Sequence, residues 1–331
     1  MIDPTTTTAP PPEPNPAGQK SPLWARWGAW LHSNPVMVKE LSARMRGKRA
    51  FIILTLYLGG LTLVVSLVYL ILLNSLRSGL GAMTNTNQLA GKMIFGVVAG
   101  MQLVSITFIA PALTSGAVSA EREHQTFDLL RTTLLPMRAF ILGKFFSALV
   151  FVFLLLFAAL PLQSLAFLFG GVAPQELLIG MLILIVTAIH FCAIGLFFSS
   201  FLKSTLASTV LSYAFPILAT FGLPFMLLIL SSFIGSLLFG VAANPAMSSP
   251  PEQLLIFIGW VLVSLHPVAT GVATELMLLD QANIWSYQLP LSNGTSMTLI
   301  SPWIVFTLVT LLFSVLLLVW STALARRKVK G

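Results

Sequence analysis

Charged residues are scarce in this chain. Of its 331 residues only 8% are charged, against roughly 25% in an ordinary soluble domain. Hydrophobic residues make up 56% of the chain, and apolar runs of about 20 residues or more recur from Phe51 onward. A soluble fold of this length needs polar surface along every element. The composition therefore excludes an ordinary soluble protein and indicates lipid as the solvent.

Cysteine is nearly absent as well. Cys192 is the single cysteine and lies inside an apolar run. One thiol excludes a disulfide framework and a cysteine-based metal cluster, so we interpret Cys192 as a packing residue. The N-terminal stretch also lacks an apolar core and is rich in Pro and Thr, which excludes a signal peptide or a span there. We expect residues 1–33 to be a disordered cytoplasmic tail and 34–331 to be the transmembrane domain.

Five apolar runs are long enough to cross a hydrocarbon core of about 30 Å. They lie near residues 51–73, 92–114, 139–169, 177–199 and 303–325. The stretch 207–240 holds at least one more span. Its prolines, Pro216 and Pro224, predict a kinked or broken helix there.

The basic residues predict the orientation of these spans. Lys and Arg near span ends are retained on the cytoplasmic side. The predicted cytoplasmic segments are 1–50, 115–144, 200–206 and 326–331. Together they hold every basic residue except Arg77 and Lys92. Both termini are therefore predicted to be cytoplasmic.

Two cytoplasmic termini require an even number of crossings, and we predict six. A further apolar run, 253–274, is interrupted by His266-Pro267 and Gly271. We therefore expect it to be a re-entrant or interfacial hairpin on the outer side. The alternative is eight crossings, with 207–240 split into two.

The segment before the first span has the signals of an amphipathic helix. Asn34-Pro35 predicts the helix start, since Asn caps a helix and Pro suits its first turn. Glu40 and Arg44 are spaced to pair at i, i+4, and Lys39 and Arg46 lie on the polar side. The apolar side consists of Met37, Val38, Leu41 and Met45. We expect this helix to lie in the membrane plane; alternatively, its basic residues only set topology.

The net charge of +8 does not require a nucleic-acid partner. Each basic residue near anionic cytoplasmic lipid gains about 1 kcal/mol. Membrane lipid is therefore the expected partner of the basic segments.

The loop between the second and third spans is unusually charged for this chain. Residues 119–134 are predicted to form a helix. Glu121 and Glu123 lie near its start, where acidic residues are favoured, and Pro136 prevents it from continuing. Its apolar face consists of Phe127, Leu130 and Leu134. A partner protein could bury Phe127 as an aromatic anchor. The alternative is a loop helix lying on its own lipid interface.

At these two segments the sequence resembles the permease subunits of ABC-2 type transporters. That family has Asn-Pro and a basic helix before its first span, as Asn34 to Leu41 do here. It also has a Ser-x-Glu-Arg-Glu-x-Gly-Thr-x-x-x-Leu motif followed by Pro and then Gly-Lys. The matching residues here are Ser119, Glu121, Arg122, Glu123, Thr126, Leu130, Pro136 and Gly143-Lys144. Gln125 stands where the family usually has Gly, which we expect to stiffen the loop helix.

The resemblance implies a bacterial exporter of the cytoplasmic (inner) membrane, with an all-α fold of six transmembrane helices like that of type V exporters. The connecting helix would include Asn34, Pro35, Lys39, Glu40 and Arg46. The coupling helix, docked on a nucleotide-binding ATPase subunit, would present Glu121, Arg122, Glu123, Thr126, Phe127 and Leu130. It further implies that 34–331 is an ABC-2 permease domain that pairs with a second copy or a paralogue. The match covers most of the chain up to about Thr220 and the last span.

The sequence offers no enzyme chemistry of its own. No Gly-x-x-x-x-Gly-Lys-Ser/Thr loop occurs, so ATP and Mg²⁺ are expected on a separate ATPase chain, with no cofactor on this one. We also expect no catalytic or metal-binding residues. His190 and His266 have no ligand-spaced partner and are interpreted as hydrogen-bonded helix residues.

Polar and small residues within the spans favour helix packing over a substrate path. Gln102, Gln163 and Thr187 are the main examples, and Gly96 with Gly100 is a weak signal of a dimer face. A secondary transporter would show repeated halves with buried charges, which the sequence lacks. A non-transporting scaffold is the remaining alternative.

Overall fold

The computed structural model describes residues 35–77, 86–126, 136–222, 224–226, 229, 252–281, 283–290 and 296–327. The helices of the first half are α2 (Pro35–Met45), α3 (Lys48–Arg77), α4 (Thr86–Thr114), α5 (Ser119–Glu123), α7 (Met137–Ala158) and α8 (Leu160–Leu168). Those of the second half are α9 (Pro174–Phe201), α10 (Thr205–Ile217) with the π-helix η1 (Leu218–Gly222), α12 (Glu252–Ser264), α13 (Pro267–Gln281) and α14 (Pro302–Arg327). Strands β1 (Ser286–Pro290) and β2 (Ser296–Ile300) precede α14.

Six helical segments of the described chain are long and apolar enough to cross a membrane. They are Ala50–Asn74, Ala90–Glu123, Met137–Leu168, Pro174–Phe201, Thr205–Met226 and Pro302–Arg326. They confirm the five apolar runs and the additional span predicted within 207–240. The architecture is therefore that of a mainly helical, multi-pass membrane protein.

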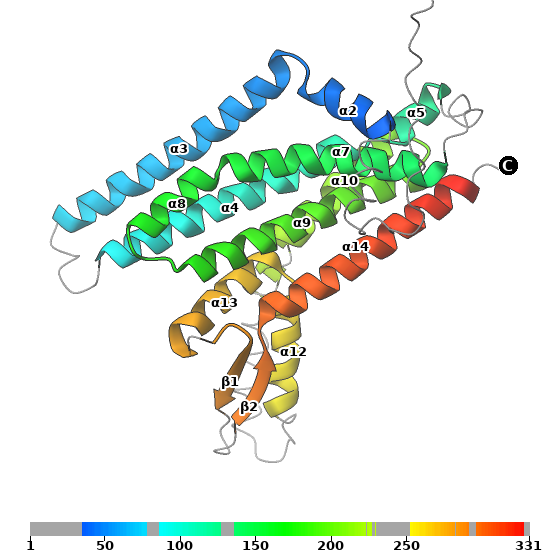
Figure 1. Ribbon diagram of the computed structural model, residues 1–331. Helices are drawn as coiled ribbons and strands as arrows, with labels where there is room; N and C mark the ends of the chain where they lie inside the picture. The colour runs from blue at the N-terminus through cyan, green and yellow to red at the C-terminus, as the bar shows by residue number, and fades with distance from the viewer. Residues whose placement is uncertain are drawn as a thin grey trace, which may run out of the picture.

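The helices form one elongated bundle with two different ends. Figure 1 shows α2, α5 and the C-terminal end of α14 together at one end. The β-hairpin, α12 and α13 lie near the start of α14. We call these the α5 end and the hairpin end.

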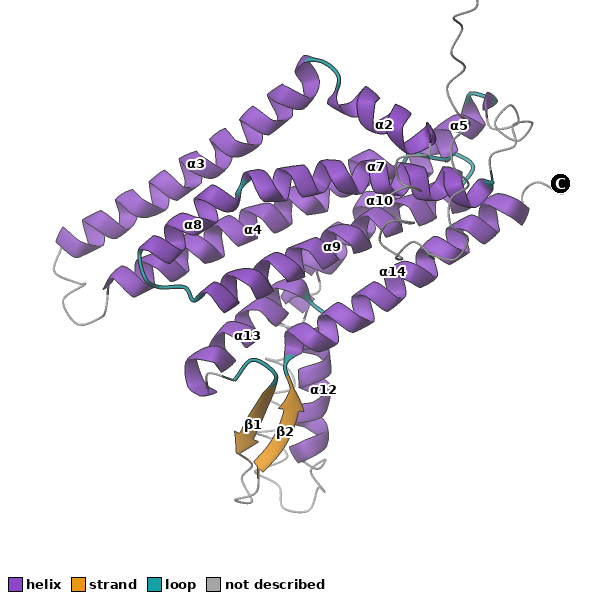
Figure 2. Cartoon of the chain, in the orientation of Figure 1, coloured by secondary structure: helices purple, strands orange, loops and turns teal. Residues whose placement is uncertain are grey.

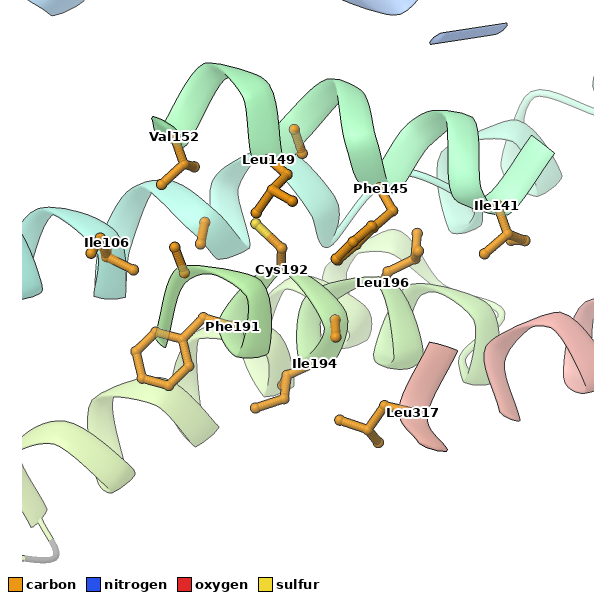
Figure 3. Close-up of a cluster of buried hydrophobic side chains, with 14 of the residues drawn as sticks. Ile106, Ile141, Phe145, Leu149, Val152, Phe191, Cys192, Ile194, Leu196 and Leu317 are labelled. Carbon is orange, nitrogen blue, oxygen red and sulfur yellow. The ribbon is translucent and has the colours of Figure 1, made fainter. Parts of the chain in front are cut away.

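The core of the bundle lies between α4, α7 and α9. Figure 3 shows Cys192 of α9 among Leu149, Phe145 and other apolar side chains of this cluster. Cys192 is fully buried, which confirms its prediction as a packing residue. Large apolar side chains such as Phe51 and Leu206 are instead exposed on the outer faces. Apolar residues thus cover both the core and the outside, as a lipid solvent requires.

Helices α4 and α9 approach each other closely because glycine occupies the contact points. A Cβ atom added at Gly195 would lie 2.0 Å from the Oγ1 of Thr114. One added at Gly180 would lie 2.7 Å from the ring of Phe95. These glycines let the α9 backbone pack directly against α4 side chains.

Helix α2 folds back from α3 onto the bundle. The reversal occurs at Gly47, whose φ of +100° is a conformation that glycine adopts without strain. Val36 of α2 packs against the main core, while α3 contacts α4 through Leu61 and Val65. The predicted helix before the first span is therefore present, and it lies against the α5 end of the bundle.

Two breaks in the helical pattern fall where prolines predicted them. The π-helix η1 begins two residues after Pro216, and such local adjustments re-satisfy backbone groups that a proline frees in a membrane helix. Helices α12 and α13 are bent by 117° relative to each other, with Leu265 and His266 between them and Pro267 starting α13. The interruption predicted at His266-Pro267 is confirmed.

A β-hairpin precedes the last span, which the all-α prediction did not include. Strands β1 and β2 pair antiparallel, with Ser286 opposite Ile300 and Pro290 opposite Ser296 (Figure 2). The sidechain Nε1 of Trp260 in α12 donates to the carbonyl of Ile300 at 3.0 Å. This bond ties the hairpin to α12. The fold is mainly helical with this small sheet added.

Candidate functional site: the charged cluster at the α5 end

Lys144, in the second turn of α7, joins three separate segments. Its Nζ lies 3.0 Å from an Oε1 of Glu121 on α5 and 3.2 Å from an Oε1 of Glu40 on α2. It also lies 5.1 Å from the centre of the Phe140 ring one turn earlier. The Lys144 side chain is only 8% exposed, whereas the two carboxylates are 28–29% exposed. A nearly buried cation thus holds two carboxylates from the two segments that carry the resemblance.

Arg44 extends this cluster to α4. Its Nη2 donates to the carbonyl of Leu113 at 2.9 Å, and its Nε lies 4.0 Å from Glu40, which confirms the predicted i, i+4 pair. Burial lowers the pKa of Arg44, while the Glu40 carboxylate opposes that shift. An arginine remains charged at neutral pH even so. We call Glu40, Arg44, Glu121 and Lys144 the Lys144 cluster.

Glu123 caps the start of α10. Its carboxylate accepts hydrogen bonds from the backbone N–H of Thr205 at 2.7 Å and from the Thr205 hydroxyl at 2.6 Å. A carboxylate at a helix N-terminus is favoured by the unpaired N–H groups and by the helix dipole. The loop segment is therefore fixed to the next span.

Arg122 and Ser199 fix the same segment to the end of α9. The Nη1 of Arg122 donates to the carbonyls of Ser200 at 3.0 Å and Leu202 at 3.3 Å. The backbone N–H groups of Val118 and Ser119 donate to the Oγ of Ser199 at 2.8 and 3.1 Å. Thus α5 is held directly by α7, α9 and α10, and Lys144 links it to α2.

The loop helix is interrupted, whereas its sequence predicts a continuous helix over 119–134. Helix α5 ends at Glu123, Gln125 has a φ of 57° in the left-handed region, and residues 127–135 lie outside the described chain. The expectation that Gln125 stiffens a continuous helix was wrong, because the backbone turns there as it would with the family's Gly. Thr126 follows, and its hydroxyl donates to the Glu121 carboxylate at 2.5 Å.

The predicted site residues are only partly brought together. Glu40, Glu121 and Thr126 join through the contacts above, and Arg122 and Glu123 lie beside them. Pro35 begins α2, while Lys39 and Arg46 are exposed. Residues predicted to contribute but lying outside the described chain are Asn34, Phe127 and Leu130. Lys144 entered the sequence analysis only as the last residue of a motif, although a lysine within an apolar span was itself a signal.

Several polar residues of the spans join helices, as predicted. The Nε2 of Gln163 donates to Gln102 at 2.6 Å. Thr187 instead donates to a carbonyl of its own helix. His190 hydrogen-bonds Ser314 at 3.0 Å, and His266 contacts the carbonyl of Thr220 at 3.2 Å.

Metal binding finds no support in the described residues. Within that part of the chain, no group of three or more His, Cys, Asp or Glu is placed to hold a metal ion. The arrangement at the α5 end instead connects one short segment to several helices. Comparison with protein-family models and with curated proteins finds no match for this chain.

Proposed function

We propose that this chain is the membrane-spanning permease subunit of an ABC-2 type transporter. It exports a substrate across the bacterial cytoplasmic membrane, and a separate ATPase subunit supplies the energy. A second copy of the chain, or a paralogue, completes the transport path. The observation that carries this proposal is Lys144, which joins Glu40 of the predicted connecting helix to Glu121 of the predicted coupling segment.

The contacts around α5 suggest how motion of an ATPase would reach the spans. A displacement of α5 pulls on α7 and α2 through Lys144, on α9 through Arg122 and on α10 through Glu123. Bonded groups of this kind move together more readily than they separate. The segment thus acts as a lever that shifts several helices at once.

The same contacts divide the predicted coupling residues into two roles. Glu121, Arg122 and Glu123 each bind partners within the chain, so they position the segment. Contact with the ATPase then falls on the exposed turn 124–126 and on the residues after it, where Phe127 is the expected aromatic anchor.

The test is to co-express the chain with the ABC-type ATPase encoded beside it and to purify the complex. We expect the ATPase to co-purify with the wild type and to be lost with Phe127→Ala. Trp285→Ala is the matched control, since Trp285 is an exposed aromatic residue at the hairpin end. Protection of the Cys192 thiol shows whether each variant is folded. Failure of any ATPase to co-purify with folded wild type would refute the proposal.

A second candidate, an ion-coupled carrier, is favoured by features of the hairpin end. Lys92 of α4 forms an ion pair with Glu275 of α13, and α13 belongs to the bent helix pair. Charged pairs and broken helices are typical of such carriers. Reconstitution in liposomes separates the two: a carrier transports with an ion gradient alone, whereas the permease requires the ATPase and ATP.

A further inference from the structure

A cavity at the hairpin end lies outside the proposed coupling mechanism. It has a volume of about 300 Å³, is lined by α4, α9 and α13, and is open on one side. Small-molecule pockets begin at about this size. Three of its lining residues, Gly96, Gly100 and Gly271, have nothing within 4 Å of an added Cβ atom. The space therefore exists because these positions lack side chains.

The Gly96 and Gly100 pair was a weak sequence signal of a dimer face. In the structure both residues line this cavity, together with apolar residues such as Leu103 and Val272. An alkyl chain that moves from lipid to such walls remains in apolar surroundings. The walls thus suit a linear apolar chain.

Charged groups gather among the lining residues. Lys92 donates a hydrogen bond to the carboxylate of Glu275, joining α4 to α13. Glu176 of α9 also lines the cavity; its carboxylate accepts from the backbone N–H of Ala173 at 3.1 Å. Two carboxylates and one ammonium group therefore line the same cavity. A cation entering here meets an excess of negative charge, and an anion meets repulsion.

We propose that this cavity binds an amphiphile made of an alkyl chain and an ammonium head group. The chain lies along the glycine-lined wall, and the head group binds Glu176 and Glu275. Lys92 holds Glu275 in place, and its positive charge offsets the repulsion between Glu176 and Glu275. The site takes this ligand whether or not an ATPase drives the chain.

Photolabelling of the purified full-length protein in dodecyl maltoside tests this proposal. The probe is dodecylamine carrying a diazirine on its alkyl chain, and the control probe is dodecanoic acid with the same diazirine. At equal mole fraction in the micelle, the amine should label peptides of α4, α9 and α13 about tenfold more than the acid, the ratio that 1.4 kcal/mol produces. Equal labelling by the two probes, or labelling confined to other helices, overturns the proposal.

Two kinds of variant locate the chain and the head group. Gly96→Leu fills the cavity and should abolish the labelling, as should Gly271→Leu from the opposite wall. Gly59→Leu is the control, because Gly59 of α3 also has open space around its Cβ position but lies outside the cavity. Labelling that persists in both cavity-filling variants, while Cys192 stays protected, contradicts the proposal.

Glu176→Gln tests the charge. Gln serves at this capping position as Glu does, so the helix start is kept while one negative charge is removed. The preference for the amine over the acid should fall about tenfold. An unchanged preference shows that the carboxylate does not recognise the head group and overturns that assignment.

The ligand has two sources, and lipid analysis separates them. Phosphatidylethanolamine that co-purifies with the wild type and is lost from Gly96→Leu identifies a bilayer lipid. Saturable labelling without co-purified lipid identifies a free alkylamine. Both outcomes support the proposal, since the two molecules share the chain and the ammonium group.

Discussion

Two lysines, one at each end of the bundle, hold carboxylates from other helices in different surroundings. Lys144 at the α5 end is 8% exposed and has two carboxylates within 3.2 Å. Lys92 at the hairpin end is 28% exposed and has one carboxylate partner, Glu275, which is also 28% exposed. Lys144 packs over the Phe140 ring, whereas Lys92 lines a cavity.

The difference separates a structural role from a binding role. A nearly buried cation has given up its water, so removing either charge leaves an uncompensated one in a poor solvent. An ion pair that lines an open cavity retains solvent or ligand as alternative partners. Its net contribution to the free energy of unfolding is therefore small. Lys144 therefore holds helices in fixed positions, while the hairpin end can exchange its contacts with a ligand.

Replacing each lysine with methionine tests this contrast most directly. We expect Lys144→Met to lower the free energy of unfolding by about 2–4 kcal/mol, because Glu40 and Glu121 then face each other without their cation. Lys92→Met should cost less than about 1 kcal/mol. Thiol labelling of Cys192, which is fully buried, measures unfolding in titrations with mixed micelles. Similar costs for the two variants would contradict the distinction between the ends.

Two adjacent serines at the α5 end, Ser199 and Ser200, should respond differently to replacement with alanine. Ser199→Ala leaves the N–H groups of Val118 and Ser119 without their acceptor and should cost about 1–3 kcal/mol. Ser200→Ala is the matched control, because the equally buried Ser200 hydroxyl has no hydrogen-bond partner among the described residues. It should be neutral or slightly stabilising. The same Cys192 titration compares them, and equal effects would show that Ser199 does not fix the α5 segment.

The spans and their breaks could be predicted from sequence because the signals are local. A hydropathy run of about 20 residues defines a span regardless of its neighbours, and Pro267 interrupts a helix through its own ring. The hairpin also had a local signal that the prediction did not use. Asn293-Gly294 lies between the two strands, in the stretch outside the described residues, and such a pair favours a hairpin turn.

The partners of charged residues could not be predicted because they depend on tertiary packing. Lys92 and Glu275 are separated by 183 positions in the sequence. Only the packing of α13 against α4 and α9 makes them neighbours. The pairing of Glu121 with Lys144 instead of an external partner was missed for the same reason, whereas Glu40 and Arg44 share one helix and were found from spacing alone.

Double-mutant cycles give the coupling energy of each ion pair. We expect a coupling of about 0.5–1 kcal/mol between Lys92→Met and Glu275→Gln, in the range of exposed pairs. Lys144→Met with Glu121→Gln should give at least about twice that value, because the cation is nearly buried. If the pair at the hairpin end has the larger coupling, Lys92 belongs to the rigid framework and the cavity wall is fixed.

The smallest effects are expected at two turns with left-handed backbone, one at each end of the bundle. Gln125 has a φ of 57° beside α5, and Gly170 has a φ of 72° in the turn between α8 and α9. A residue with a Cβ atom pays about 1–2 kcal/mol in this conformation, and glycine does not. Glycine also gains freedom in the unfolded chain, which offsets roughly 0.5–1 kcal/mol of that relief.

Exchanging the two residue types at these turns completes the comparison. Gln125→Gly should stabilise the protein by up to about 1 kcal/mol, and Gly170→Gln should destabilise it by a similar amount. A Cβ atom at Gly170 has open space around it, so backbone strain alone sets the cost there. Gln125→Ala keeps the Cβ atom and should lie near the wild type. If Gln125→Gly instead lowers stability in the Cys192 titration, the Gln125 side chain contributes contacts that outweigh its backbone strain. Side-chain contacts, and not the backbone conformation, would then determine which residue suits this turn.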